Sequence, residues 1–425
     1  MELQDYGWQN DGEWRGQKFL VQLPSPGPRL FPASHSYGAT NRAGPERRRP
    51  EATPPEPRCH YFMIPQQPAR TDPGSRTFLL KNHTSDELAV CLSDAGVGLP
   101  LARRILAAAV RRGELPTLGR GLSAPTLEKL RAMTEIPHLT QVETVVSAKD
   151  GFKKYLFRGA GPEPFEAVRI PLLHRPGDLK YVVCVSSQVG CAMGCVFCAT
   201  GRNGFGRNLA AWEIVDQVIK IQADSPHPVR GVVFMGMGEP LLNYEAVITA
   251  ARILSEPCGL AIAGKAITLS TVGIVAGIRR LTAEGHPFRL VVSLTTANPT
   301  QRADLMPVER ANPTPELLQA LREYHEATGQ RVTLAWTMMA GVNMDAAAVQ
   351  ALAELTRGLP IKLDLIDVND PTGRFRPPSQ AQLDAFRDAL RAGLGMPVAR
   401  RYSGGQDIHA ACGMLAGTVS RGERG

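Results

Sequence analysis

The chain has 425 residues, which is enough for a large hydrophobic core with a smaller domain beside it. Its formal charge of +8 is compatible with an RNA partner but excludes little, because many basic soluble proteins bind no nucleic acid. No run approaches the roughly 20 apolar residues of a membrane span, and the N-terminus shows no signal-peptide core, so we expect a soluble, cytoplasmic monomer without a membrane partner.

We expect residues 1–75 to form a disordered, proline-rich extension. Between Pro24 and Pro73 the chain has many prolines and few aliphatic residues, and it carries a basic run at 47–49. Such a composition buries too little apolar surface to offset the entropy lost on ordering. A dispensable tail or a misassigned start site is favoured over an RNA-binding arm.

Residues 84–150 are predicted to form a small helical accessory domain. Thr84 or Ser85 can cap a first helix, since a short hydroxyl side chain accepts a hydrogen bond from the first helical turn. The stretches 101–112 and 123–133 carry apolar residues at helical spacing. A structural cap on the main domain is one role that such a unit can have.

Residues 151–180 are predicted to be a connecting strand region, and strands alternate with helices over the remainder, 181–425. Helical stretches include 212–222 and 315–327. Strand–helix alternation of this kind favours an α/β fold around a parallel sheet. The predicted strands span 181–187, 231–235, 266–270, 289–294, 332–338 and 361–366.

Three cysteines with the spacing C-x3-C-x2-C follow the first of these strands, at Cys191, Cys195 and Cys198. Thiolates suit iron–sulfur clusters, and three of them can hold three irons of a [4Fe–4S] cluster. The fourth iron is then open to a substrate or cofactor. Gly190 and Gly194 let a short loop turn tightly around such a group.

Zinc binding and disulfides are the alternatives for these cysteines. Structural zinc sites usually combine paired C-x2-C knuckles with four protein ligands, whereas one knuckle is present here. Disulfides are disfavoured, because eight cysteines are few for a chain of this length. Cys59, Cys91 and Cys258 are interpreted as bystanders.

The cysteine loop is the signature of the radical S-adenosylmethionine (SAM) superfamily, and three longer motifs narrow the match. Residues 184–191 (CVSSQVGC), 235–243 (MGMGEPLLN) and 407–417 (DIHAACGMLAG) closely resemble the RlmN/Cfr family of radical SAM RNA adenosine methyltransferases. The resemblance covers roughly residues 85–417. It implies a partial (β/α)6 radical SAM barrel with active groups at the C-terminal ends of its strands. It also implies that the small N-terminal helical domain helps to hold RNA.

The resemblance implies one [4Fe–4S] cluster, SAM, and an electron donor such as flavodoxin or ferredoxin. From the residues alone, Glu239 is a natural acceptor for the SAM amine and the glycines before it allow close backbone approach, although most such turns are only turns. Small polar residues at strand ends are likewise often caps. The positions that match SAM contacts of the family are Gly238, Glu239, Ser270, Ser293, Leu294, Thr295 and Asn369.

Three further residues match catalytic groups of the family. Cys412 matches the cysteine that carries a methyl group, although a lone cysteine among alanines is ordinarily a small buried side chain. Cys184 matches the cysteine that releases the product through a transient disulfide, and a buried structural cysteine is its alternative. Glu166 matches the proton acceptor, and a solvated strand residue is the alternative.

The resemblance implies methylation of an adenosine ring carbon, C2 in preference to C8, in 23S ribosomal RNA, with transfer RNA as a second candidate substrate. The chain departs from the family at 293–296 and 367–370, and the basic tail that is common after the carrier cysteine is nearly absent. These departures keep another RNA or nucleotide open as the substrate. A non-catalytic iron–sulfur or zinc protein that binds RNA is the alternative from another class.

Overall fold

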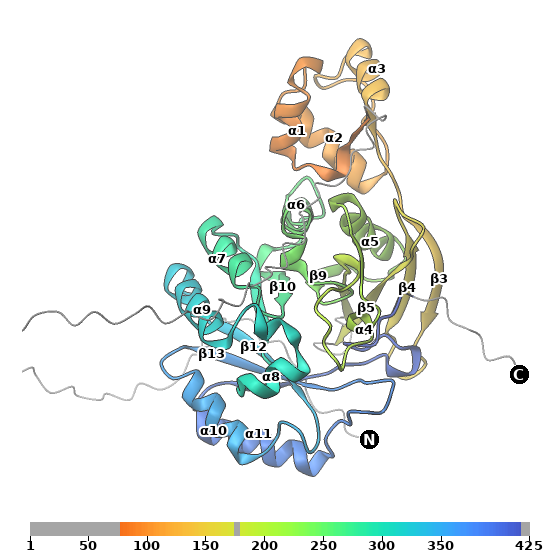
Figure 1. The fold of residues 1–425 in the computed structure, drawn as a ribbon. Helices are drawn as coiled ribbons and strands as arrows, with labels where there is room; N and C mark the ends of the chain where they lie inside the picture. The colour runs from red at the N-terminus through yellow and green to blue at the C-terminus, as the bar shows by residue number, and fades with distance from the viewer. Residues whose placement is uncertain (1–76, 174–178, 418–425) are drawn as a thin grey trace, which may run out of the picture. The chain divides into compact units, whose positions relative to one another are not determined.

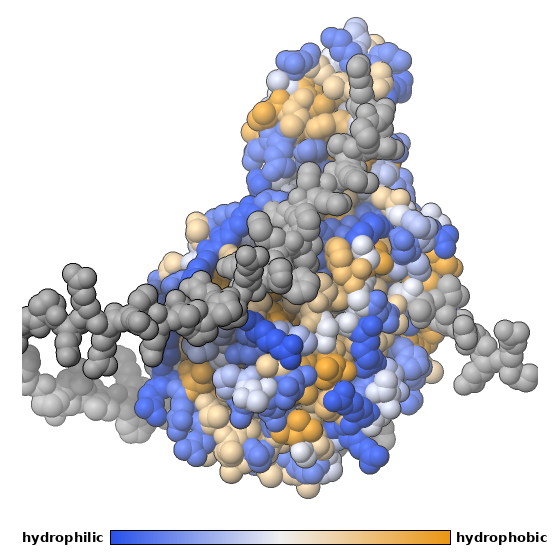
Figure 2. Space-filling model, viewed as in Figure 1, coloured by the Kyte–Doolittle hydropathy of each residue, from blue (hydrophilic) through white to orange (hydrophobic). Residues whose placement is uncertain are grey.

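The computed structural model describes residues 77–173 and 179–417 (Figure 1). The extension expected over 1–75 lies outside these residues. On the face seen in Figure 2, hydrophilic side chains predominate and apolar ones gather in small patches. None of the described helices is long and apolar enough to cross a membrane.

The N-terminal part of the described chain is helical. The Thr84 hydroxyl accepts a hydrogen bond from the Glu87 N–H, and the Glu87 carboxylate accepts one from the Thr84 N–H, so both hydrogen bonds of a capping box are present. Leu88, Ile105 and Leu130 are buried among these helices. The helices are α1 (Ser85–Cys91), α2 (Leu99–Arg111) and α3 (Ala124–Met133), and strands β1 (Phe78–Leu79) and β2 (Thr134–Glu135) pair beside them.

The main sheet has the strand order β14-β13-β12-β11-β10-β9-β6-β5-β4-β3. Neighbouring strands from β6 to β14 run parallel, whereas the pairs from β3 to β6 are antiparallel. The strands are β3 (Thr140–Val146), β4 (Lys153–Arg158), β5 (Phe165–Leu173), β6 (Leu179–Cys184), β9 (Val229–Phe234), β10 (Ile267–Thr271), β11 (Arg289–Ser293), β12 (Val332–Met338), β13 (Ile361–Asp367) and β14 (Val398–Arg401).

All six predicted parallel strands are confirmed, which gives the α/β fold of a partial barrel. Strand β14 was not predicted, because it is short and two of its residues are arginines. The division into domains stays a prediction. Strand β3 falls within 84–150 but pairs with β4 of the main sheet.

Amphipathic helices follow the parallel strands and lie around the sheet in Figure 1. Helices close in the chain pack on one another, as α5 does on α6, α10 on α11, and α7 on α9, with the short α8 between the last two in sequence. They are α4 (Ala199–Arg202), α5 (Ala211–Ala223), α6 (Tyr244–Ser255), α7 (Val275–Glu284), α8 (Pro299–Leu305), α9 (Thr314–Thr328), α10 (Ala346–Leu355) and α11 (Gln380–Leu394).

A buried ion pair joins the N-terminal part to helix α5. Lys81 lies in the short 3₁₀ helix η1 (Leu80–Asn82), and its ammonium group pairs with Asp216 of α5; both side chains are fully buried. The second Asp216 oxygen accepts a hydrogen bond of 2.7 Å from the Leu139 N–H. The carboxylate is therefore held by two segments that are far from it in sequence.

Replacing Lys81 by methionine should destabilise the protein strongly. The change leaves the Asp216 charge buried without its partner, which typically costs about 3–5 kcal/mol. The double variant Lys81→Met/Asp216→Asn should recover much of this loss, because the amide oxygen still accepts from Leu139. Urea unfolding of the two variants and the wild type measures both effects. A loss below about 1 kcal/mol for the single variant would contradict a charged pair.

Candidate active site

The three cysteines lie on one loop between strand β7 (Gln188–Gly190) and helix α4. Cys191 and Cys195 are buried, and Cys198 is half-buried. The Cys191 N–H donates to the Gly204 carbonyl at 2.7 Å, and the Cys198 N–H donates to the Cys195 carbonyl at 3.1 Å. Backbone hydrogen bonds therefore fix the loop.

Glycine is required at two places in this loop. Gly190 has a φ of +71°, and a Cβ there would lie 2.0 Å from the Gly204 carbonyl oxygen. Gly194 has a φ of +65°, which side chains rarely tolerate. The backbone thus folds back on itself within the segment that carries the three thiols.

Burial makes the Cys191 and Cys195 thiols reluctant to ionise. It raises the pKa of Cys191 to about 12, with Glu239 and Cys198 adding to the effect. It raises the pKa of Cys195 well above its ordinary value, and both neighbouring thiols contribute. Metal ligation requires thiolates, so a positively charged group must bind to offset the cost of ionising them.

The donor set fits a cluster better than a single ion. Among the described residues, no three His, Cys, Asp or Glu side chains converge as they would around one metal ion. A cluster places each thiolate on a different iron, so its ligands need not converge. The charged or ionisable neighbours of Cys195 are two thiols, Glu239 and Arg302, with neither a fourth thiol nor an imidazole. Structural zinc sites with three cysteines usually take a fourth cysteine or a histidine, and neither is among these described neighbours of Cys195.

Glu239 follows strand β9 and lies close to the cysteine loop. Its side chain is buried, and its carboxylate accepts hydrogen bonds from the N–H groups of Leu241 at 3.0 Å and Val272 at 2.9 Å. Burial nevertheless raises the pKa of Glu239 to about 7. Gly238 before it has a φ of +101°, and a Cβ there would lie 2.6 Å from Gln188. The turn therefore cannot accept a side chain at 238.

Strand pairing places the other predicted residues on one face of the sheet. Cys184 of β6 pairs with Val233 of β9, which pairs with Thr268 of β10. Ser270 lies two residues further along β10, so its side chain points to the same face as that of Cys184. The next strands continue this row, since Ser293 of β11 ends two residues beyond the partner of Ser270.

The turn after β11 is strained. Leu294 and Thr295 are both fully buried, and Thr295 has a φ of +65°. The Asn343 side chain donates to the Thr295 carbonyl at 2.8 Å. Among the described residues, the buried Thr295 hydroxyl has no hydrogen-bond partner, so a ligand at the strand ends could supply one.

Asn369 has a role that sequence reasoning missed. Its side-chain amide donates to the Ser403 hydroxyl at 3.0 Å and to the Cys412 carbonyl at 3.3 Å, and its oxygen accepts from Gln406 at 2.8 Å. The Ser403 hydroxyl in turn accepts from the Cys412 N–H at 3.1 Å. Asn369 therefore positions the backbone of Cys412.

Cys412 lies against the strand ends on the same face of the sheet. It packs on an apolar cluster of Val291, Ala335 and Ile366, together with Met235. Cys184 and Cys412 are close enough to affect each other electrostatically: burial raises the pKa of Cys184 to about 12, and Cys412 adds to this. The described cysteines are all free, so the expected disulfide is not formed in this structure.

Glu166 of β5 is buried rather than solvated. Its carboxylate lies 2.9 Å from the Lys154 ammonium and accepts from the N–H groups of Ala416 at 2.7 Å and Gly417 at 3.0 Å. Four and five residues after Cys412, the chain is therefore pinned to strand β5. Glu166, which was singled out by its sequence match, therefore contacts the same segment that carries Cys412.

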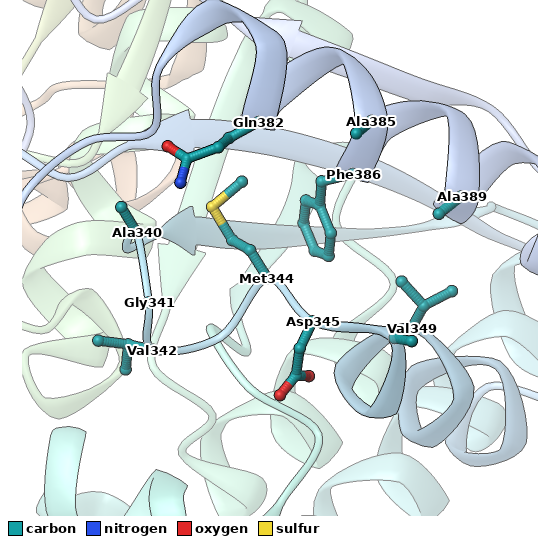
Figure 3. A pocket seen from close by; sticks show the side chains of 11 residues that line it. Ala340, Gly341, Val342, Met344, Asp345, Val349, Gln382, Ala385, Phe386 and Ala389 are labelled. Atoms are coloured by element: carbon teal, nitrogen blue, oxygen red, sulfur yellow. The ribbon is translucent and has the colours of Figure 1, made fainter.

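The pocket in Figure 3 is separate from this group of residues. It has a volume of about 410 Å³ and lies between the loop after β12, the start of α10, and α11. Met344, Val349 and Phe386 line it together with small side chains. None of the predicted site residues contributes to its wall.

Comparison with known proteins gives one family. A family model described as the radical SAM superfamily matches residues 185–352. A "Probable RNA methyltransferase" of Myxococcus xanthus is 48% identical over 80% of this chain and 94% of its own length. A "Probable dual-specificity RNA methyltransferase RlmN" of Moorella thermoacetica is 40% identical over 72% of this chain and 93% of its own.

A solved structure agrees with the sequence relatives. The chain is similar to a radical SAM methyltransferase from Sphaerobacter thermophilus, with 38% identity and a TM-score of 0.72. The match covers 80% of this chain and 100% of the chain of the solved structure. The likeness therefore extends over the whole of the compared fold.

The pH dependence of stability should report on Glu239. The unfolded carboxyl ionises near its ordinary pKa of 4.5 and the folded one near 7, so the unfolded state loses its proton first as the pH rises. Stability should fall over that interval by up to about 3 kcal/mol. A Glu239→Gln variant should lack this fall, which urea unfolding of the metal-free proteins at several pH values measures. Parallel stability curves for the two proteins would contradict a raised pKa.

Proposed function

This chain belongs to the RlmN-type radical SAM RNA methyltransferases, and we propose that it methylates an adenosine ring carbon through a methyl group carried on Cys412. We propose C2 rather than C8 as the target carbon, and 23S ribosomal RNA as the main substrate, with transfer RNA as a second one. The enzyme would work in the cytoplasm with a flavodoxin or ferredoxin as its electron donor.

One observation carries the proposal: Cys412 is held against both the cysteine loop and Cys184. The Ala199 N–H donates to the Gly413 carbonyl at 2.7 Å, and the Thr200 hydroxyl donates to the Leu415 carbonyl at 2.6 Å. Helix α4, which begins just after Cys198, is thus hydrogen-bonded to the segment that carries Cys412. A cysteine with a purely structural role would not need to be held beside a second thiol and the cysteine loop.

Each group has a defined task in this proposal. Cys191, Cys195 and Cys198 would hold a [4Fe–4S] cluster, which with SAM supplies the one-electron chemistry that activates an otherwise inert C–H bond. Glu239 and the strand ends at Ser270 and 293–295 would bind SAM. The buried carboxylate suits an ammonium group, because a cation that is brought beside it offsets the cost of its ionisation.

The remaining residues act on the adduct between protein and RNA. Cys412 carries the methyl-derived carbon that joins the adenine ring, and Cys184 attacks the Cys412 sulfur so that the product leaves. Glu166 accepts the proton that the ring carbon loses. The Lys154 ammonium and the backbone N–H groups of Ala416 and Gly417 hold this carboxylate beside the segment that carries Cys412.

Removing Cys184 should trap the RNA on the protein. In a Cys184→Ala variant the adduct forms but is not released, so RNA should stay covalently bound to Cys412 after purification without oxygen. Sequencing the bound RNA names the substrate and the target base. Cys258→Ala is the matched control, since that cysteine lies in the loop after α6, and it should carry no RNA. Intact SAM cleavage without any adduct would contradict the carrier mechanism.

Removing one loop cysteine should remove the whole cluster. A Cys195→Ala variant leaves two thiols, which is too few to hold three irons, so bound iron, sulfide and visible absorbance should all be lost. The wild type should bind about four irons when reconstituted. Recovery of one zinc ion per chain and no sulfide in the wild type would contradict the cluster.

A further inference from the structure

Arg401 lies on the face of the sheet that also carries Cys184 and Cys412. Arg401 ends strand β14 and pairs with Ile366 of β13, so the two side chains share one face of the sheet. Ile366 belongs to the apolar cluster on which Cys412 packs. The adjacent Arg400 instead pairs with Asp367 at 2.7 Å. Position 401 therefore brings a cation to the face that carries the site.

Arg401 has an unusually weak partner for a half-buried cation. Its Nη1 lies 2.8 Å from the Met235 sulfur, a weak acceptor. In the part of the chain that the structure describes, no carboxylate lies within ion-pair distance of Arg401, whereas Arg202, Arg302 and the adjacent Arg400 each have one. A cation held in this way is poorly compensated and attracts an anion.

Met235 connects this cation to both thiols. Its backbone makes a hydrogen bond to Cys184, its side chain packs on the same cluster as Cys412, and its sulfur contacts Arg401. Cys184, Cys412 and Arg401 thus meet around one residue. Burial raises the pKa of Cys184 and Arg401 opposes that rise, so the cation favours the thiolate form.

Few other charges act on Cys184. On the same face of the sheet, Lys154 of β4 pairs with Val168 of β5, which pairs with Cys184. Lys154 is already bound to Glu166, so this pair has little net charge to offer. Cys412 is the other titratable neighbour, and its effect disfavours the thiolate. Arg401 is therefore the group that can stabilise a negative charge on Cys184.

We propose that Arg401 is a positioning residue for product release, because its guanidinium stabilises the Cys184 thiolate that attacks Cys412. The inference rests on the proposed carrier mechanism and adds a residue to it. Cys184 loses its proton to water, and its sulfur forms a bond to the Cys412 sulfur. The bond from that sulfur to the methylene carbon breaks, and its electron pair passes to the adenine-linked carbon. That carbon takes one proton from water and becomes a methyl group, so no external oxidant is needed.

Replacing Arg401 by glutamine should slow the release of RNA and leave the earlier steps intact. A cation near an ionisable group typically shifts its pKa by about 1–3 units, so at neutral pH release should be about tenfold slower or more. The adduct should then accumulate in Arg401→Gln, as it does in Cys184→Ala. Raising the pH should restore release, since hydroxide makes the thiolate that the cation no longer favours. Arg401→Lys keeps the charge and should fall between the two.

The measurement is a single-turnover time course at pH 6.5 to 9.5, with the covalent adduct quantified on denaturing gels. Formation of 5′-deoxyadenosine in each variant serves as the test that the fold and the cofactor sites are intact. Should Arg401→Gln fail this test, Arg401→Met, which also removes the charge, provides the same pH comparison in a folded protein. Release with the wild-type rate and pH dependence in the folded variant would overturn the proposal.

A double variant separates this role from RNA binding. If Arg401 acts on Cys184 alone, Arg401→Gln added to Cys184→Ala should leave the yield of adduct unchanged. A lower yield would show that Arg401 binds an anionic group of the RNA instead, and would overturn the proposal. If Cys184→Ala itself gives no adduct, the carrier mechanism fails and the role of Arg401 fails with it, which is a different result from adduct without an Arg401 effect.

Discussion

The site depends on how the segment after Ser403 is tied down, because that segment alone brings Cys412 to the strand ends. Asn369 holds the Cys412 backbone, Thr200 holds Leu415, and Glu166 holds the two residues that follow it. These three anchors come from the end of β13, from α4 and from β5. Removing any one of these three anchors would release backbone groups that keep Cys412 beside Cys184, while the barrel would keep its own hydrogen bonds.

Burial away from water governs the ionisation of the cysteine and glutamate side chains in this site. Burial raises the pKa values of Cys184, Cys191 and Glu239, so ionising each group costs more than it would in water. A nearby cation lowers this cost, and its source differs from group to group. Iron would serve the loop cysteines, the ammonium group of SAM would serve Glu239, and Arg401 would serve Cys184. A low-dielectric pocket thus makes reactivity conditional on the correct partner.

Much of this arrangement was predictable from local sequence. The cysteine spacing, the glycines around it and the apolar runs of six strands are patterns within a few residues, and the structure has the strands where they were expected. Arg401 and the anchoring role of Asn369 were not predictable in this way. Strand β14 has no apolar alternation to reveal which face Arg401 takes, and the partners of Asn369 lie 34 to 43 residues further along the chain.

The turn at Thr295 shows that shaping this site costs the protein some of its stability. A threonine with a φ of +65° and an unpartnered buried hydroxyl carries two unfavourable terms, each of roughly 1–3 kcal/mol. The turn persists because its carbonyls are fixed from outside: Asn343 donates to that of Thr295, and the buried Arg302 donates to that of Leu294. Arg302 also donates to the Val272 carbonyl, so one side chain holds the ends of β10 and β11 together. These strand ends are therefore fixed by the protein's own hydrogen bonds, so a ligand that binds there need not supply the free energy to order them.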